Sequence, residues 1–574
     1  MTGEVRLRPD RNGVEIVADA NDPYDLARRL RSMEPELRPR VSRGRLQFDF
    51  SQADGLLGVA TLRWAPDAAR AVANRRRVRE RAPEVMAAVA NIRTADTQAL
   101  RERLGSSTVL DVLDHHQLLN VALMTVSNGW GACIFDEQGT GKTPTVIAAF
   151  DVLVDRNEVD TLIVVSPKSM IGEWAEEFRR FCGDLYRVAI VEGSRQQRAT
   201  TLASGADVVV VNYEAAISLQ EDLRLLATRS RVVMAVDESF NVKNPDAART
   251  AAVADLREWC ERCFALCGTP APNAPGDVIA QVSLVDFGHT FEGLCLNDDP
   301  DRDRGLIRDA LGVRGLFTRN LKATVLPGLP QRQFSEVSVE FSSEQRRLYT
   351  GALDGLILDL EHSDDASYRR EQLSFSARRS ALLRLCSHPA GVVPGYAELP
   401  GKILALDELL AQHAGAGHKV VVWSFYRMTL DFLAARYGHY GIARIDGSIA
   451  DVADRREAVR RFQEDDETLV FLGNPAAAGA GLTLHSAALA IYESFSNQAA
   501  HFMQSLDRIH RRGQARNVEY LVLLCSGSVE ESEYERILRK VDLQADLLGD
   551  PEPYRPTREI LMSELVASRD RVGR

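Results

Sequence analysis

The chain has 574 residues, of which 45% are hydrophobic and 26% charged, and its formal net charge is −11. This acidic balance excludes a wholly basic nucleic-acid coat protein, but it is compatible with a local positive groove along phosphates. No apolar run approaches the roughly 20 residues that span a bilayer, and the charged start MTGEVRLRPDRNG lacks the apolar core of a signal peptide. The eight cysteines are too few for a disulfide framework. We therefore expect a cytoplasmic protein with no membrane partner.

Residues 1–104 are predicted to form a small α+β accessory module. The segments EVRLR, VEIVA and LQFDF have the pattern of short strands. A helix is expected from about Pro66, and it carries a cluster of arginines, Arg75, Arg76, Arg77, Arg79 and Arg81. The cluster fits either a patch that contacts phosphates or an ordinary solvated helix face.

Two series of short apolar segments alternate with helical stretches along the rest of the chain. The first series (GACIF, TLIVVSP, ADVVVVN, VVMAVDE, CFALCGTP) lies in 105–290, and the second (KVVVWSF, IARIDG, TLVFLGN, LAIYES, VEYLVLL) lies in 401–545. Near-continuous β-branched runs separated by helices predict parallel sheets covered on both faces. We expect an α/β protein with two tandem parallel-sheet lobes, a helical inter-lobe region over 291–400 and a C-terminal tail over 546–574.

The strongest motif is DEQGTGKT, from Asp136 to Thr143, between the strand GACIF and a helix. A glycine-rich loop there directs backbone N–H groups toward phosphate at a helix N-terminus. Lys142 would reach the β- and γ-phosphates of ATP, and the Thr143 hydroxyl would ligate Mg²⁺. The nucleotide-binding candidates in the loop are Gly139, Thr140, Gly141, Lys142 and Thr143. Asp136 departs from the stricter motif, which has glycine in its place.

A second motif, VVMAVDES, places Asp237 and Glu238 at the end of an apolar strand. A carboxylate in this position holds Mg²⁺, and its neighbour orients or activates the attacking water. Asp237 is therefore the second predicted Mg²⁺ ligand, and Glu238 is the predicted catalytic carboxylate. An isolated Asp-Glu pair after a strand is more often the start of a helix, but a pair that follows a phosphate loop favours nucleotide hydrolysis.

The third motif, QSLDRIHRRGQ, carries Arg508 and Arg511 in the second lobe. Three residues apart on one helical face, both arginines would point the same way across a cleft. An arginine so placed stabilises charge on a transferring phosphoryl group. The alternative is a surface helix whose arginines form salt bridges.

From Gln117 to Gln514, the motifs and their order resemble the Swi/Snf-type branch of the superfamily-two helicase-like ATPases. The resemblance also covers the segments IVVSPKSMIGEWAEEF, VVVVNYEA, DESFNVKN, ALCGTPAPN, FTRNLKATVLPGLPQR, FSSEQRRLY and LLRLCSHPAGV. It implies two RecA-like lobes and a DNA-dependent ATPase that translocates on double-stranded DNA.

The resemblance also implies roles for single residues. Gln117 would read adenine, Gln504 would contribute to the nucleotide site, and Arg511 would be the arginine finger with Arg508 beside it. The implied DNA contacts are Lys168, Ser169, Asn212, Tyr213, Ser424, Arg427, Gly479 and Gly481. The implied coupling residues are Phe240, Gly268 and Thr269.

Two segments depart from the family pattern. Phe240 stands where the family usually has histidine, and phenylalanine provides no side-chain hydrogen bond to link DNA binding with hydrolysis. AAAGAGLTLHSA in the second lobe is closer to the fork-remodelling, annealing-helicase relatives.

Metal binding is a weak alternative for two groups of residues. Cys260, Cys263 and Cys267 lack a fourth ligand at useful spacing, so we expect buried core thiols. His115 and His116 have no acidic or thiol partner nearby in the sequence, which favours a place in the adenine pocket or an exposed turn.

The leading functional hypothesis is an ATP-dependent motor on double-stranded DNA that acts in repair, fork remodelling, protein displacement or phage defence. One alternative is an ATP-gated DNA clamp or regulatory subunit of a larger nuclease or defence complex. Another is a strand-separating DNA or RNA helicase. The Ala- and Arg-rich composition indicates a bacterial or phage source, and residues 1–104 are the candidate binding region for a protein partner.

Overall fold

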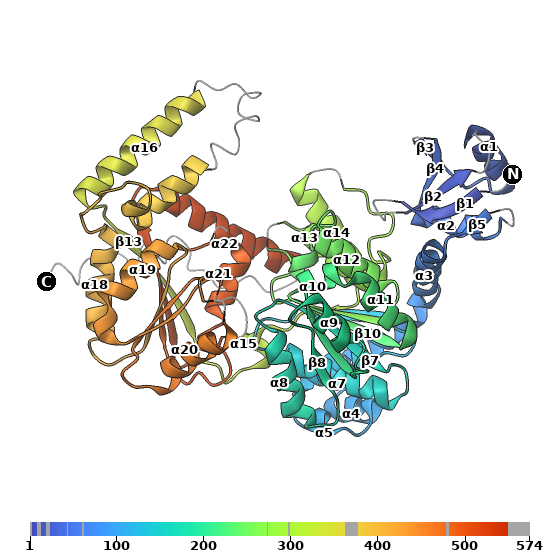
Figure 1. Ribbon diagram of the computed structural model, residues 1–574, viewed down its shortest axis with the longest axis horizontal. Helices are drawn as coiled ribbons and strands as arrows, with labels where there is room; N and C mark the ends of the chain where they lie inside the picture. The colour runs from blue at the N-terminus through green and yellow to red at the C-terminus, as the bar shows by residue number, and fades with distance from the viewer. Residues whose placement is uncertain are drawn as a thin grey trace.

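Two parallel-sheet lobes lie side by side in the computed structural model, and a smaller β-rich module projects from the first lobe (Figure 1). The α/β class and the two-lobe organisation predicted above are confirmed. The structure describes residues 3–8, 13–18, 23–42, 44–59, 62–272, 274–296, 299–361, 377–449, 451–477, 482–496 and 498–548. Gly479, Gly481 and the chain after 548, which holds most of the predicted tail, lie outside the described residues. No helix among the described residues is both long enough and apolar enough to span a bilayer.

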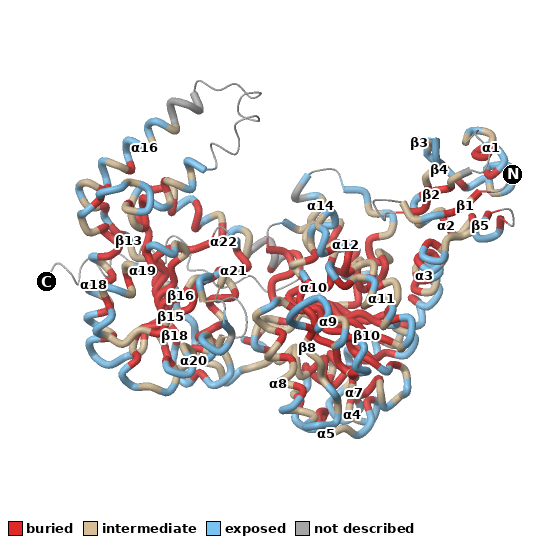
Figure 2. Tube along the Cα trace, in the orientation of Figure 1, coloured by how far each residue is buried: buried red, intermediate tan, exposed pale blue. Residues whose placement is uncertain are grey.

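Lobe 1 is built on a seven-stranded parallel sheet. Its strands are, in spatial order, β12 (Phe317–Thr318), β6 (Gly131–Ile134), β11 (Arg262–Leu266), β10 (Val232–Asp237), β7 (Thr161–Ser166), β9 (Val208–Asn212) and β8 (Val188–Ile190). The central strands are buried along their whole length, as Figure 2 shows in red. Runs of valine and isoleucine suit such strands because helices cover both faces.

The helices of lobe 1 cover this sheet and connect its strands. They are α4 (Thr97–Leu104), α5 (Thr108–Asp111), α6 (His115–Met124), α7 (Lys142–Asp155), α8 (Ile171–Cys182), α9 (Arg195–Leu202), α10 (Tyr213–Ser218), α11 (Gln220–Arg229), the 3-10 turn η1 (Ser239–Val242), α12 (Ala248–Arg257), α13 (Asp277–Asp286), α14 (Pro300–Arg314) and α15 (Lys322–Val325). Because the strands are parallel, the loops that leave their carboxyl ends gather at one edge of the sheet.

Lobe 2 contains a six-stranded parallel sheet. Its spatial order is β13 (Arg332–Val339), β18 (Val518–Cys525), β17 (Leu489–Tyr492), β14 (Val420–Trp423), β16 (Val470–Gly473) and β15 (Ile442–Ile445). Its helices include α16 (Ser343–Glu361), η2 (Pro389–Gly391), α18 (Gly401–His413), α19 (Arg427–Arg436), η3 (Gly438–Tyr440), α20 (Val452–Glu464), α21 (Ala499–Leu506) and α22 (Val529–Leu548). Two apolar clusters, one on each face of the sheet, form its core.

The region over 291–400 contains strands as well as the expected helices. Within it, β12 pairs with β6 of lobe 1, and β13 pairs with β18 of lobe 2. Each strand lies at the edge of its sheet, where one neighbour suffices and the apolar signal is weak. The chain therefore passes from the sheet of lobe 1 to the sheet of lobe 2 between Thr318 and Arg332, in the segment that contains α15.

The N-terminal module is a five-stranded mixed sheet with the order β3 (Arg40–Ser42), β4 (Arg45–Asp49), β2 (Gly13–Ala18), β1 (Gly3–Leu7) and β5 (Leu62–Trp64). Helices α1 (Pro23–Met33), α2 (Phe50–Leu57) and the start of α3 (Pro66–Arg93) contribute to its separate apolar core. The far half of α3, including Val85 and Val89, belongs instead to the core of lobe 1. One unbroken helix thus joins the module to lobe 1 (Figure 1).

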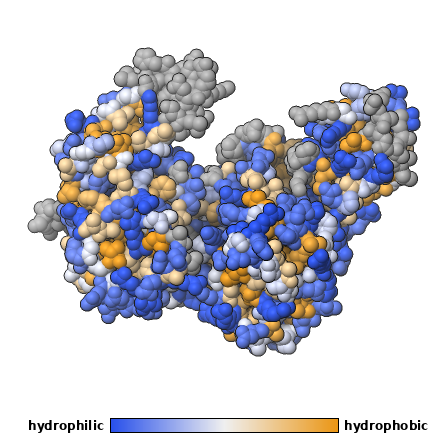
Figure 3. Space-filling model, in the orientation of Figure 1, coloured by the Kyte–Doolittle hydropathy of each residue, from blue (hydrophilic) through white to orange (hydrophobic). Residues whose placement is uncertain are grey.

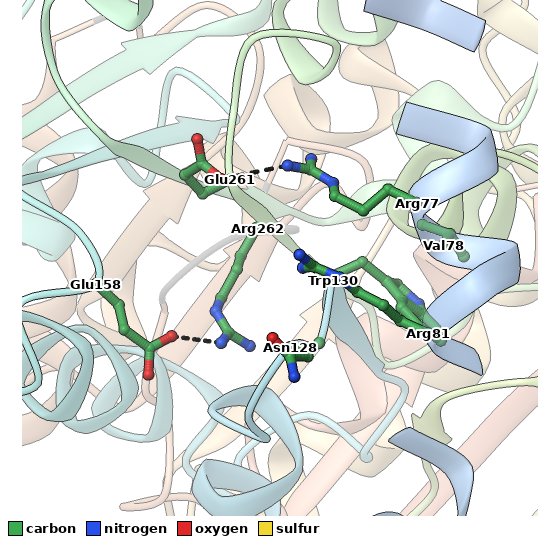
Figure 4. A pocket seen from close by; sticks show the side chains of 9 residues that line it. Arg77, Val78, Arg81, Asn128, Trp130, Glu158, Glu261 and Arg262 are labelled. Atoms are coloured by element: carbon green, nitrogen blue, oxygen red, sulfur yellow. Dashed lines mark hydrogen bonds and ion pairs between the residues drawn. The ribbon is translucent and has the colours of Figure 1, made fainter. Parts of the chain in front are cut away.

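The predicted arginine cluster on α3 joins the module to lobe 1. Arg75 pairs with Glu258 at 2.7 Å, and Arg79 pairs with both Asp54 of the module and Glu292 of lobe 1. Arg77 reaches Glu261 beside a small cavity of about 180 Å³ that Arg81 also lines (Figure 4). Carboxylates across the interface thus engage Arg75, Arg77 and Arg79, which corrects both earlier interpretations for these three residues. Arg76, which pairs with Glu80 on the same helix, and Arg81 are exposed, as a solvated helix face predicts.

Helix α22 connects the two lobes from the other side. Tyr534 and Ile537 lie in the core of lobe 2, whereas Leu547 and Leu548 at its end lie in the core of lobe 1. The helix packs on α14 as it crosses the interface (Figure 1). The lobes are therefore linked by α22 as well as by the chain around α15.

Candidate active site

The phosphate loop lies at the carboxyl edge of the lobe 1 sheet, between β6 and α7. Gly139 and Gly141 have φ angles of 82° and 90°, in the left-handed region that glycine adopts without strain. A Cβ atom on Gly141 would lie 2.0 Å from Nε2 of Gln117, so this position tolerates only glycine. Lys142 Nζ donates to the carbonyl oxygens of Asp136 at 2.9 Å and Glu137 at 3.2 Å. The Lys142 ammonium thus contacts the backbone at the start of the loop.

Asp136, which stands where the stricter motif has glycine, supports the phosphate loop with its side chain. Its carboxylate accepts hydrogen bonds from Asn120, Thr318 and both the backbone and side chain of Asn320, at 2.7–3.0 Å. Asp136 is 1% exposed. A buried carboxylate with this many donors fixes the loop's starting point, a role that glycine could not perform.

The residues expected near adenine lie on α6, beside the loop. Gln117 accepts from the backbone N–H of Asp114 at 2.8 Å and donates to the carbonyl of Thr140 at 3.2 Å. His116 contacts the same carbonyl through Nε2 at 3.0 Å, whereas the exposed His115 contacts Thr97. Of the two histidines, His116 therefore adjoins the loop.

Asp237 and Glu238 end β10 directly beside the phosphate loop. Asp237 Oδ2 accepts from Ser166 Oγ at 2.9 Å and from Trp174 Nε1 at 3.0 Å. Glu238 has a left-handed backbone with φ 49° and accepts a hydrogen bond from Gln138 of the loop. Burial raises the pKa of Asp237, and burial together with the Asp237 charge raises that of Glu238 to about 7. Such poised acids are typical of catalytic sites.

The donor set fits a hard divalent cation. Asp237 offers carboxylate oxygens, Thr143 offers a half-buried hydroxyl, and Oε2 of Glu238 is buried without a hydrogen-bond partner in the described part of the chain. Hard oxygen ligands of this kind suit Mg²⁺, which usually also keeps water and substrate phosphate in its shell. Thr143 and Asp237 would hold the ion, with Glu238 left to act on water.

Arg508 and Arg511 enter the site from lobe 2, but they are not on a helix. Helix α21, which contains the buried Gln504, ends at Leu506, and a turn formed by residues 507–513 follows. We call this segment the arginine turn. The predicted helix stops where donors other than helical N–H groups take its carbonyls. The distant Leu484 N–H bonds Arg508 O, and the nearby Gln514 Nε2 bonds Ile509 O. These tertiary bonds replace the helical ones.

Both arginines nevertheless lie close to residues of lobe 1, Arg511 to the phosphate loop and Arg508 to Glu238. Cβ of Arg511 lies 3.7 Å from the position a Cβ on Gly139 would take, and its guanidinium donates to Thr483 Oγ1 at 2.7 Å. Arg508 is 5% exposed, and its charge acts on the titration of Glu238. Burial lowers the pKa of both guanidinium groups, though both remain cationic. The loop of lobe 1 and the arginines of lobe 2 therefore line one seam.

Two further charged residues at the seam were not predicted. Lys322, at the start of α15, is fully buried and donates to Asp507 Oδ1 at 2.6 Å and to the carbonyl of His510 at 2.8 Å. Glu173 on α8 faces both arginines, and burial raises its pKa to about 7 against their opposing charges. Lys322 lies in the motif FTRNLKATVLPGLPQR, which was a signal, whereas nothing in the sequence distinguishes Glu173.

The coupling candidates adjoin the loop through Gln138. A Cβ on Gly268 would lie 2.9 Å from Cγ of Gln138, and Gln138 in turn bonds Glu238. Thr269 is buried and donates its N–H to Cys267 Sγ at 3.3 Å. Phe240 lies in η1, half-buried against the lobe 1 core. A shift of the Gly268 turn would thus move Gln138 and, through it, the Glu238 carboxylate.

The structure separates the predicted DNA contacts into two groups. Exposed Lys168 and half-buried Ser169 line a cavity of about 820 Å³ between the lobes, opposite Arg455, Arg456 and Arg460 of α20. Arg427 is also exposed. The other predicted contacts with described side chains, Asn212, Tyr213 and Ser424, are buried.

The three buried residues make internal hydrogen bonds. Asn212 caps α10 by accepting from Ala215 N at 2.7 Å, and Tyr213 donates to the carbonyl of Asp237 at 2.6 Å. Ser424 donates to Glu493 at 2.7 Å. In this structure these side chains support neighbouring loops, and their contact with DNA stays a prediction. Sequence alone gave no sign of this burial.

Cys260, Cys263 and Cys267 do not gather with further potential ligands into a metal-binding group among the described residues. Cys260, Cys263 and Cys267 are buried free thiols, as predicted, and burial raises the pKa of Cys263 and Cys267 to about 12. A different group, Cys386, Cys525 and Glu530, brings potential ligands within 4.8 Å of one another. The ammonium of Lys402 already binds Glu530 at 2.7 Å in this buried group, so a cation would have to displace it.

The raised pKa of Glu238 predicts a pH-dependent rate. Because only the ionised carboxylate can accept a proton from water, we expect kcat/KM for ATP to fall as the pH drops below about 7. Glu238→Gln should lower kcat at least about 100-fold and remove this acid limb. Steady-state hydrolysis from pH 6 to 8, roughly, measures both. An acid limb that persists in Glu238→Gln would assign the titration to ATP or to another group.

The chain was compared with known proteins. The family model described as SNF2-related domain matches residues 115–390, and that of the helicase conserved C-terminal domain matches residues 401–513. A probable chromatin-remodeling complex ATPase chain of Oryza sativa is 27% identical over 455 residues, covering 74% of this chain and 40% of that protein. The DNA repair and recombination protein RAD54-like of Drosophila persimilis is 25% identical over 484 residues, covering 74% and 61%.

This chain thus spans less than two thirds of the length of these relatives. Among solved structures, the Sulfolobus solfataricus SWI2/SNF2 ATPase core in complex with dsDNA is 21% identical. It covers 75% of this chain and 93% of that chain, with a TM-score of 0.33.

Proposed function

Because the chain belongs to the SNF2-related family of helicase-like ATPases, we propose that it hydrolyses ATP to translocate on double-stranded DNA. The observation that carries the proposal is the position of Arg511 of lobe 2 against Gly139 of the lobe 1 phosphate loop. A nucleotide bound there would contact the phosphate loop of lobe 1 and the arginines of lobe 2. Hydrolysis would then depend on how the lobes meet.

The proposed chemistry uses this chain's residues on both sides of the seam. Lys142 and the loop N–H groups bind the phosphates, and Glu238 accepts the proton of the attacking water. Arg508 and Arg511 stabilise charge on the transferring phosphoryl group. Mg²⁺, when bound at Thr143 and Asp237, would offset phosphate charge. Loss of the γ-phosphate removes the group that both lobes hold, which lets the seam open.

DNA would pass over the mouth of the inter-lobe cavity. Lys168 on one wall and Arg455, Arg456 and Arg460 on the other outnumber the acidic lining residues Glu173 and Glu464. The visible surface is otherwise mostly hydrophilic with scattered apolar side chains (Figure 3). Contacts to phosphates carry no sequence information, so tracking should be independent of sequence and sensitive to salt. Repair, fork remodelling, protein displacement and phage defence are all compatible tasks.

Phe240 favours a second candidate function, an ATP-gated clamp or regulatory subunit. A phenylalanine side chain cannot hydrogen-bond to the Gly268 turn, and a weak link between DNA and Glu238 would leave nucleotide as a switch. In that case the N-terminal module, fixed rigidly on α3, would present a protein partner to the DNA-bound lobes.

ATP turnover with different nucleic acids separates these functions. We expect duplex DNA to stimulate turnover strongly and to support displacement of a triplex-forming strand. Slow turnover that DNA does not change would favour the switch. Preferential stimulation by single strands or RNA would indicate a strand-separating helicase. Forked DNA in the same assay tests fork remodelling.

Substitution of Phe240 tests the coupling argument directly. We expect Phe240→His to raise the ratio of DNA-stimulated to basal ATP turnover, because the imidazole can hydrogen-bond to the adjacent turn. Phe240→Leu is the matched control, since it keeps an apolar side chain and should not raise the ratio. An unchanged or lower ratio in Phe240→His would remove Phe240 from the account of coupling.

A further inference from the structure

A buried ammonium group connects the phosphate loop to the arginine turn. Lys322 is 0% exposed, and its Nζ binds the Asp507 carboxylate on one side and the His510 carbonyl on the other. These two partners directly precede Arg508 and Arg511. We propose that Lys322 is a positioning residue that sets both arginines on the nucleotide site. The proposal rests on the proposed function.

The backbone of Lys322 is part of the support of the phosphate loop. Its N–H donates to the carboxylate of Glu137, and the Glu137 N–H donates to the carbonyl of Asn320 at 3.0 Å. The side-chain stem then runs past the loop, with Cε 3.4 Å from the position of a Cβ on Gly139. One residue therefore has its main chain fixed on lobe 1 and its charged end fixed on lobe 2.

The hydrogen bond to His510 also explains the shape of the arginine turn. In a continued helix, the His510 carbonyl would accept from a backbone N–H in the next turn. Here it accepts from Lys322, while the distant Leu484 N–H and the nearby Gln514 side chain bind the carbonyls of Arg508 and Ile509. Lys322 thus contributes one of the bonds that hold Arg508 and Arg511 in a turn rather than on a helix.

Burial distinguishes this contact from the other ion pairs across the seam. Arg456–Glu176 and Arg512–Asp114 also join the lobes, but all four of these side chains are between 43% and 64% exposed. Water and salt screen such pairs, so they constrain geometry weakly. The ammonium of Lys322 is shielded from water, so its burial is favourable only while Asp507 and His510 of lobe 2 bind it. The lysine contact therefore depends on the arrangement of the lobes, and the arrangement depends on the contact.

A positioning role predicts a selective kinetic effect. The arginines act on charge that develops in the transition state, whereas the loop binds ATP in the ground state. Loss of the lysine contact should therefore lower kcat and leave nucleotide affinity intact. A residue that merely stabilised the loop would change both.

The test uses the full chain with three changes, Lys322→Met, Asp507→Asn and their combination. Lys322→Met keeps a long stem without the charge, and Asp507→Asn removes the pair from the other side at constant volume. We expect each to lower kcat at least about tenfold while the Kd for a fluorescent ATP analogue changes less than about twofold. The double variant should be no worse than the worse single variant, because both remove one interaction.

Glu176→Gln is the matched control. It removes an exposed inter-lobe ion pair and should leave kcat within about twofold of the parent. If Lys322→Met does not fold, as a thermal unfolding scan would show, Asp507→Asn alone decides. Unchanged kcat in the folded variants overturns the proposal, and so does a parallel loss of nucleotide affinity.

A second readout does not depend on turnover. Fluorescence transfer between labels on the two lobes, measured without nucleotide, should show a broader range of inter-lobe distances in Lys322→Met and Asp507→Asn than in the parent or Glu176→Gln. An unchanged range would overturn the proposal. If the parent chain hydrolyses no ATP, the proposed function fails, while this measurement still decides whether Lys322 sets the lobe arrangement.

Discussion

Replacement of Lys142 by alanine should abolish ATP turnover and most nucleotide binding. The ammonium lies across the phosphate loop, 2.9 Å from the carbonyl of Asp136, and its charge acts on both Asp237 and Glu238. Its loss removes the cation nearest the phosphates and leaves the two buried carboxyls without that compensation. We expect kcat/KM to fall at least about 100-fold. Steady-state hydrolysis and binding of a fluorescent ATP analogue measure the two effects.

Lys419→Ala is the control for Lys142→Ala. Lys419 also donates to main-chain carbonyls, those of Phe462, Gln463 and Asp465, but it lies in lobe 2 and outside the seam. It should lower stability without changing kcat/KM by more than about twofold. Near-normal turnover in Lys142→Ala would refute the assignment of the phosphate loop.

Arg511→Ala should leave ATP bound but unhydrolysed. In family-type phosphoryl transfer, a finger arginine contributes roughly 10³–10⁵ in rate, and Arg511 adjoins Gly139 of the phosphate loop. Its present hydrogen bonds, to Leu482 O at 3.2 Å and Thr483 Oγ1 at 2.7 Å, hold it at the seam. We expect kcat to fall within that range while the Kd for nucleotide stays nearly constant. Single-turnover hydrolysis with a separate binding assay measures this.

The neighbouring Arg512 provides the matched control. It pairs with Asp114 across the seam but is largely exposed, so Arg512→Ala should leave the hydrolysis rate nearly unchanged. Arg511→Lys should rescue little, because an ammonium lacks the planar fork of the guanidinium. A rate for Arg511→Ala that matches the parent would take away its finger role.

The central strands and the nucleotide motifs were predictable because their signals are local. Continuous valine runs such as VVVVN are typical of buried strands between helices, and the glycines of the loop adopt backbone angles that other residues avoid. Two edge strands, β12 and β13, were not recognised, although the edge strand β15 was predicted from IARIDG. β12 has two residues, and β13 alternates apolar and polar side chains with only Val339 buried, so neither has the pattern of a central strand.

The remaining differences arise from contacts between distant segments. The arginine turn has the local sequence of a helix, but the distant residues Leu484 and Lys322 donate to its carbonyls. Tyr213 lies in a segment that was predicted to contact DNA, yet its hydroxyl donates a hydrogen bond to the backbone carbonyl of Asp237. Such partners are specified by the fold and not by the neighbouring residues, which is why sequence located the motifs better than the roles of their members.

Helix α22 limits the kind of motion that the two lobes can make. Its 20 residues form a strut of about 30 Å, rooted in lobe 2 and ending at Leu547 and Leu548 among the apolar side chains of lobe 1. Exposing both leucines to water would cost roughly 3–6 kcal/mol. We therefore expect the lobes to rotate about the end of α22 and not to separate. In the proposed ATP cycle, the lobes should thus turn relative to each other through a restricted angle about that end.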